Sequence, residues 1–137
     1  GRSLSDMELQ TACTVVIGED VEGMIEAQRA KVAFQMGAMG SAKTNFYNEA
    51  VQRAGYAEDA QAVQSLWVAG KRDEARKRVP DAMITKFGAI GTPEMVRERF
   101  KVYKKAGISS LAFRFADNDA KTNIAQLEQA MDLVKGL

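Results

Sequence analysis

The chain has 137 residues, of which 46% are hydrophobic and 27% are charged, a composition typical of one globular domain rather than of a disordered chain. Its net charge of +1 provides no attraction toward nucleic acid or an anionic membrane, and no apolar run approaches the ~18 residues of a membrane span. Because Cys13 is the single cysteine and histidine is absent, an internal disulfide, a structural zinc site and histidine-activated nucleophiles are excluded. We therefore expect a cytoplasmic protein without a metal, whose chemistry depends on other side chains or on a cofactor.

The first predicted elements are a strand and a helix. Residues 9–18 are rich in Thr, Val and Ile, and the nearly continuous apolar run 11–17 is typical of a strand buried on both faces. Cys13 lies in this run, where a thiol behaves as a small hydrophobic group. Asp20 then caps a helix. The expected inner stripe of that helix is Val21, Met24, Ile25, Gln28 and Val32.

The sequence of the middle of the chain predicts a loop followed by several short helices. From Met36 to Thr44 we expect a loop, because Gly37 and Gly40 interrupt the helical period. Several short helices follow as far as Gly88, ended by glycines or by Pro80. This predicts a helical insertion over residues 36–88 within a single α/β unit over 1–137. Its expected inner apolar positions include Phe46, Tyr47, Ala60, Val63, Leu66 and Trp67.

The last third returns to alternating strands and helices. Residues 89–91 predict a minimal strand, and Thr92 with Pro93 supplies an N-cap and an N1 proline for a helix carrying Val96, Phe100 and Tyr103. A strand over 108–115 completes a tight βαβ unit, whose strands should be parallel. The final helix carries Ile124, Leu127, Met131 and Val134.

Three parallel strands leave both edges of a sheet open. The pattern therefore fits the last three β/α units of a (β/α)₈ barrel, with an insertion between the first two. A small open α/β sandwich fits the same periodicity, so the pattern by itself leaves both architectures open.

A set of short motifs resembles the C-terminal part of the luciferase-like monooxygenase family. The motifs occur in the family's order along the chain: 36–40, 45–48, 53–56, 69–75, 79–81, 90–99 and 106–108. The resemblance is strongest to the branch that uses coenzyme F420, with flavin mononucleotide as the alternative. It implies a (β/α)₈ barrel, hydride transfer between the deazaflavin and a small organic substrate, and a Gly1 that lies deep inside a longer parent protein. Most of the implied cofactor site belongs to strands absent here, so we expect the chain alone to be inactive.

Two candidate sites lie at the carboxyl ends of predicted strands, where barrels carry their chemistry. The helix start at Gly91-Thr92 is a candidate for binding the cofactor through free N–H groups, and its alternative is plain helix capping. Arg114 interrupts an apolar strand with a charge that we expect to be buried and paired. It either reaches an anionic substrate or cofactor or forms a structural ion pair with Glu19, Asp117 or Asp119.

The segment from Met36 to Tyr47 is the third candidate. Gly37 and Gly40 would permit close approach of the backbone to the cofactor, and Phe46 or Tyr47 would offer a flat wall to the substrate. The alternative is that both aromatic residues form the core face of their helix. A hypothesis of another class is a non-catalytic α/β module that forms a homo-oligomer, such as a dimer, through its sheet edge.

Overall fold

The computed structural model describes residues 3, 6–41, 44–116 and 119–137. The chain divides into two units, one formed by Gly1–Met24 with Thr85–Leu137 and the other by Ile25–Ile84. Helix α1 (Val21–Ala38) belongs to both units, and Asp20 caps it as expected by accepting from the Gly23 N–H at 3.0 Å. Within the described residues, no helix has the length and apolar character that crossing a membrane requires.

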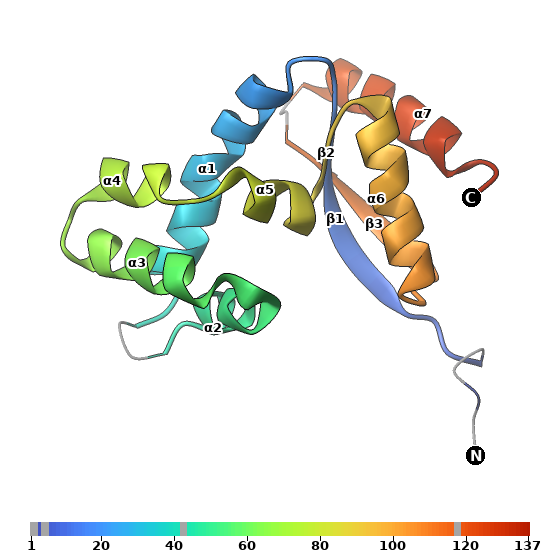
Figure 1. The fold of residues 1–137 in the computed structure, drawn as a ribbon. Helices are drawn as coiled ribbons and strands as arrows, with labels where there is room; N and C mark the ends of the chain where they lie inside the picture. Colours follow the sequence, from blue (N-terminus) through green and yellow to red (C-terminus); the bar gives the residue numbers. More distant parts are fainter. Residues whose placement is uncertain (1–2, 4–5, 42–43, 117–118) are drawn as a thin grey trace. The chain divides into compact units, whose positions relative to one another are not determined.

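The first unit contains a three-stranded parallel sheet (Figure 1). Its strands are β1 (Gln10–Ile17), β2 (Ala89–Gly91) and β3 (Ser110–Phe115), in the order β2-β1-β3. Strand β3 pairs with β1 from Gln10↔Ser110 to Val15↔Phe115, whereas β2 pairs only with the last three residues of β1. The α/β class with three parallel strands is thus confirmed.

The expected βαβ unit is present, because β2 and β3 are parallel and joined by a helix, but the two strands are not adjacent. Strands β2 and β3 are both parallel to β1 but do not neighbour each other, because β1 lies between them. Their connection is helix α6 (Pro93–Lys105), whose 13 residues extend for about 20 Å and can carry the chain past one strand. The three strands are therefore not three successive neighbours in chain order.

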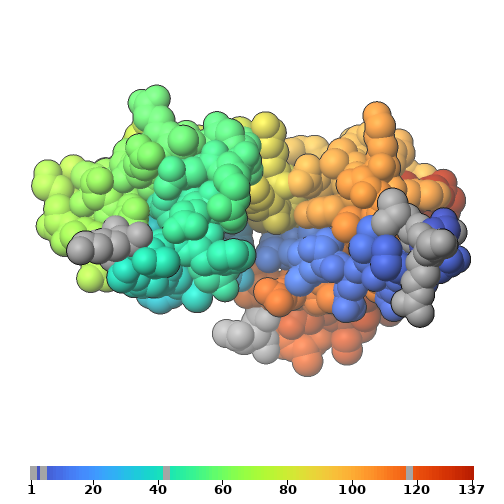
Figure 2. Space-filling view, turned by 90° about the horizontal axis from the view of Figure 1, so that it is seen from below, coloured from blue at the N-terminus to red at the C-terminus, as the bar shows by residue number. Residues whose placement is uncertain are grey.

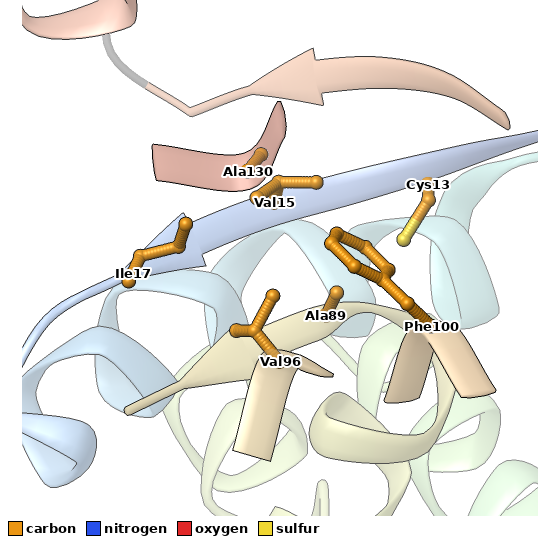
Figure 3. Packing of buried hydrophobic residues seen from close by; sticks show 7 residues of the cluster. All are labelled: Cys13, Val15, Ile17, Ala89, Val96, Phe100 and Ala130. Carbon is orange, nitrogen blue, oxygen red and sulfur yellow. The ribbon is translucent and has the colours of Figure 1, made fainter. Parts of the chain in front are cut away.

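Helices α6 and α7 (Ala120–Val134) cover one face of this sheet (Figure 3). The ring of Phe100 stacks on that of Phe113 with centroids 5.4 Å apart. The buried cluster on this face consists of Cys13, Val15, Ile17, Ala89, Val96, Phe100 and Ala130.

The other face of β1 is open, so the expectation of burial on both faces is wrong for this strand. Ala12 is exposed, and Thr14 and Val16 are only half-buried. Figure 2 shows the N-terminal segment of the first unit, in blue, at the surface between orange and orange-red segments of the carboxy-terminal third. The sheet thus has one packed face and one accessible face.

The second unit is helical. After α1 come α2 (Phe46–Val51), the π-helical turn η2 (Gln52–Tyr56), α3 (Ala57–Val68), α4 (Arg72–Lys77) and α5 (Asp81–Phe87), whose last three residues belong to the first unit. The unit buries apolar side chains from α1, α3, α4 and α5. They include Ala33, Met36, Ala60, Val63, Ala75 and Met83.

The predicted loop at Met36 begins later than expected, because α1 continues to Ala38. Glycine costs a helix interior only about 1 kcal/mol, and here the missing side chain makes room for Trp67. A Cβ at Gly37 would lie 2.3 Å from Cγ of Trp67. Tertiary packing therefore overrides the local tendency of glycine to end the helix.

Candidate functional site

The carboxyl ends of β1 and β2 are fixed by hydrogen bonds from two directions. The Gly18 N–H donates to the Gly91 carbonyl at 3.1 Å, which joins the two strand ends. From α7, Nε2 of Gln126 donates to the Ile17 carbonyl at 2.9 Å and Oε1 accepts from the Ile17 N–H at 2.7 Å. The sequence analysis did not identify Gln126. The feature that could have indicated its inward position is the spacing of four residues from the buried Ala130, which places both residues on the same helix face.

A cavity of about 200 Å³ lies at this edge, between the ends of β1 and β3 and the first turns of α7. Ligand pockets usually measure about 300–1,000 Å³, so this cavity is small for a flavin-like ring system. Its lining combines apolar walls with three polar side chains: Val15, Val16, Phe115, Ala116, Thr122, Asn123 and Gln126.

The start of α7 beside this cavity carries its own carboxylate. Asp119 accepts from the Thr122 N–H at 2.8 Å and from the Thr122 hydroxyl at 2.8 Å, and these bonds lower the pKa of Asp119. A carboxylate at this position compensates the positive end of the helix dipole. The helix start is therefore an unfavourable place for a second anion.

Gly91 and Thr92 lie at the end of β2. Gly91 has φ of 145°, and a Cβ there would come within 2.8 Å of Sδ of Met95, so the position requires glycine. Thr92 caps α6 by accepting from the Met95 N–H at 3.4 Å, and Pro93 begins the helix. The capping role is confirmed, while cofactor binding by these two residues stays a prediction.

Arg114 is exposed, which corrects the expectation of a buried charge. The reason is the open sheet face: Arg114 pairs in register with Thr14 and points away from the core formed by Phe113 and Phe115. In the described part of the chain it forms no ion pair with Glu19 or with Asp119. The third expected partner, Asp117, lies outside the described residues.

The remaining four predicted site residues lie in the second unit. Gly37 packs against Trp67, and Gly40 adopts φ of 122° where a Cβ would lie 2.4 Å from the Thr44 carbonyl oxygen. Phe46 is 70% exposed and Tyr47 is also exposed, so the alternative that both form the core face of their helix is wrong. These residues belong to a different unit from Arg114 and Thr92.

Helix α2 instead buries a polar side chain. Asn48 donates from Nδ2 to the Met36 carbonyl at 3.1 Å and to the Ala60 carbonyl at 2.7 Å. Its backbone N–H donates to Oδ1 of Asn45, the helix cap, at 3.0 Å. The side-chain amides of both buried residues, Asn45 and Asn48, thus donate and accept hydrogen bonds, which allows them to be buried in place of the aromatic residues.

The sequence profile of the luciferase-like monooxygenase family matches residues 1–110. The chain belongs to this family.

The similar proteins include one curated relative and one solved structure. A protein of Mycobacterium tuberculosis, provisionally named as a coenzyme F420-dependent oxidoreductase, is 28% identical over 126 residues, which are 92% of this chain and 36% of that protein. The structure of the coenzyme F420-dependent tetrahydromethanopterin reductase from Methanopyrus kandleri shares the fold, with a TM-score of 0.63 and 24% identity over 97% of this chain and 35% of the reductase. The fold is that of part of a (β/α)₈ barrel, and the chain spans about a third of the length of these relatives.

Proposed function

We propose that this chain contributes part of a coenzyme F420-dependent oxidoreductase that transfers hydride between the deazaflavin and a small organic substrate. The observation that supports the proposal most is the family match over residues 1–110, together with two similar proteins that are both named for coenzyme F420. The deazaflavin, when bound, donates or accepts the hydride, so this part of the chemistry does not depend on a histidine of this chain.

The described residues at the carboxyl edge of the sheet form a site too small for a complete cofactor. The cavity at the carboxyl edge, about 200 Å³, is smaller than a deazaflavin ring system requires. We therefore propose that the chain alone is inactive and that other β/α units of the barrel supply most of the cofactor site. Arg114, on the open face of the sheet, is our candidate for binding an anionic group of the substrate or cofactor.

A fluorescence titration tests this proposal. The chain alone should show no saturable binding of coenzyme F420 or of flavin mononucleotide. A chimera in which the chain replaces the matched segment of the M. tuberculosis relative should bind coenzyme F420 and not flavin mononucleotide. In that chimera Arg114→Gln should weaken binding of coenzyme F420 or raise the KM of the substrate by about tenfold, the loss of one charge-assisted hydrogen bond. Saturable binding of flavin mononucleotide alone would assign the chain to the flavin branch instead.

A non-catalytic module that self-associates is the second candidate function. The supporting observation is that β3 lies at the edge of the described sheet and carries Arg114 as its single charged residue and no proline. Light scattering after size exclusion distinguishes the candidates, because the module should form a defined homodimer.

A further inference from the structure

The first turn of α6 places a methionine thioether at the end of β2. Met95 is 41% exposed. Its Sδ lies so close to the backbone of Gly91 that a Cβ added there would be 2.8 Å from the sulfur atom. The Gly91 carbonyl in turn accepts from the Gly18 N–H at 3.1 Å, the bond that joins the ends of β1 and β2. One side of the sulfur atom is therefore covered by the backbone of the strand end.

Met95 also lines a hollow of about 470 Å³ on this flank of the sheet. Ile90 of β2 contributes an apolar wall, and Arg99 contributes its guanidinium group. Two carboxylates, Glu94 and Glu98, line the same hollow and repel a bound anion. The hollow therefore gives small neutral molecules, such as hydrogen peroxide, access to the sulfur atom.

Arg99 holds a buried donor that lacks an acceptor. Its Nη2 donates to the Lys86 carbonyl, and its guanidinium carbon lies 5.0 Å from the centre of the Tyr103 ring. Its Nε is buried and has no hydrogen-bond partner among the residues that the structure describes. The carboxylate next to it in the sequence, Glu98, pairs with Lys101 at 2.5 Å instead. A buried N–H without an acceptor is unfavourable, so this Nε is available to a new oxygen atom in the hollow.

The thioether and the unpaired donor lie on the same face of α6. Met95 and Arg99 are four residues apart in this helix, and both line the hollow. Long side chains of a helix lean toward its N-terminus, which directs Arg99 toward Met95. A thioether sulfur is only a weak acceptor, whereas the oxygen of a methionine sulfoxide is polar. Oxidation of Met95 would therefore give Nε of Arg99 the acceptor that it lacks.

We propose that Met95 is a site of oxidation by hydrogen peroxide, and that the sulfoxide oxygen accepts a hydrogen bond from Nε of Arg99. A lone pair of Sδ attacks one peroxide oxygen, the S–O bond forms and the O–O bond breaks. The leaving hydroxide takes the proton of the transferred hydroxyl group and departs as water, so the sulfur is oxidised and the peroxide is reduced. The guanidinium group stabilises the negative charge that develops on the oxygen atoms. This modification does not depend on the proposed function.

Peptide mass spectrometry of the folded chain in dilute hydrogen peroxide tests the proposal. Met131 is the internal comparison, because it is 50% exposed and the cation four residues after it, Lys135, is paired with Asp132 at 2.7 Å. Exposure alone predicts that Met131 is oxidised before Met95. We expect Met95 to be oxidised faster by about threefold or more, because only Met95 has an unpaired donor beside it. Its sulfoxide should also contain one sulfur epimer in an excess of about threefold or more, because Gly91 covers one side of the sulfur atom.

Arg99→Leu removes the donor and should slow the oxidation of Met95 to the rate of Met131 or below, with circular dichroism confirming that the variant is folded. The matched control is Lys105→Leu, which removes the same charge from an exposed position of α6 and should leave the rate at Met95 unchanged.

Stereospecific sulfoxide reductases measure the ratio of the two epimers, and in urea both the faster rate and the epimer excess at Met95 should disappear. The proposal is overturned if Met95 in the folded chain is oxidised no faster than Met131. It is also overturned if Arg99→Leu changes neither the rate nor the epimer ratio, or if both preferences persist in the unfolded chain.

Discussion

Cys13 lies on the packed face of β1 at 1% exposure, and burial raises the pKa of its thiol above the ordinary value of 9.0. The pKa of Tyr103, which lies beside it, is also raised by burial. In the unfolded chain both groups release their protons at lower pH than in the folded chain. The free energy of unfolding should therefore be fully retained below pH 9 and decrease as the pH rises above about 9, measured by urea unfolding at pH 7 to 10.5.

Cys13→Ala provides the control for this pH dependence. The variant should be less stable at pH 7 because it loses buried volume, yet its stability should decrease less between pH 9 and 10. If the free energy of unfolding of the variant decreased with pH as steeply as that of the wild type, ionisation of the thiol would not be linked to folding. Labelling of the wild-type thiol at pH 8 should likewise be slow until urea unfolds the chain.

Helix α2 shows how an element can be held by amides rather than by apolar side chains. Replacing Asn48 by Leu removes its bonds to the Met36 and Ala60 carbonyls and the bond that it accepts from Gln52, while the Met36 carbonyl keeps the bond from Asn45. Each lost hydrogen bond contributes about 0.5–1.5 kcal/mol, so we expect Asn48→Leu to lower the free energy of unfolding by about 2–4 kcal/mol. Circular dichroism in urea measures this loss.

The neighbouring Gln61 is a matched control for Asn48. Its side chain is exposed and donates to Oε1 of Gln52 at 3.1 Å. Gln61→Leu should change the free energy of unfolding by less than about 0.5 kcal/mol, because water replaces the lost partner. A loss as large as that of Asn48→Leu would mean that buried amide bonding is not what holds α2.

At the scale of the whole molecule, low net charge and open sheet edges favour association. With a net charge of +1, repulsion between copies is weak. Because the chain has no histidine, no side chain with an ordinary pKa titrates between pH 6 and 7.5. Light-scattering mass should therefore rise with concentration equally at pH 6 and pH 7.5, and Met131→Glu, which places a charge at an exposed apolar side chain, should reduce the rise. A sharp pH dependence would show that charge, rather than apolar surface, drives association.

Much of the local structure could be predicted from particular residues. Thr92 with Pro93 marks the start of α6, Asp20 caps α1, and the strand at 89–91 has the predicted bounds. These features depend on neighbours within about four residues, so the local sequence is sufficient to specify them. The site at Gln126 could not be predicted, because its partner Ile17 is 109 residues away in the chain.

The sequence by itself determined the α/β class, the parallel strands, the helix caps, the buried thiol of Cys13 and the motifs that resemble the luciferase-like family. Only the tertiary structure decided that β1 lies between β2 and β3, that Arg114 is on an open face, and that α7 turns Ala130 inward. It also decided that α1 passes through Gly37 and that Asn48, not Phe46, is buried. The physical reason is the distance along the chain over which the determining interactions act. Helix caps and hydrophobic periodicity depend on adjacent residues, whereas strand order and the choice of which sheet face the helices cover depend on contacts between distant segments.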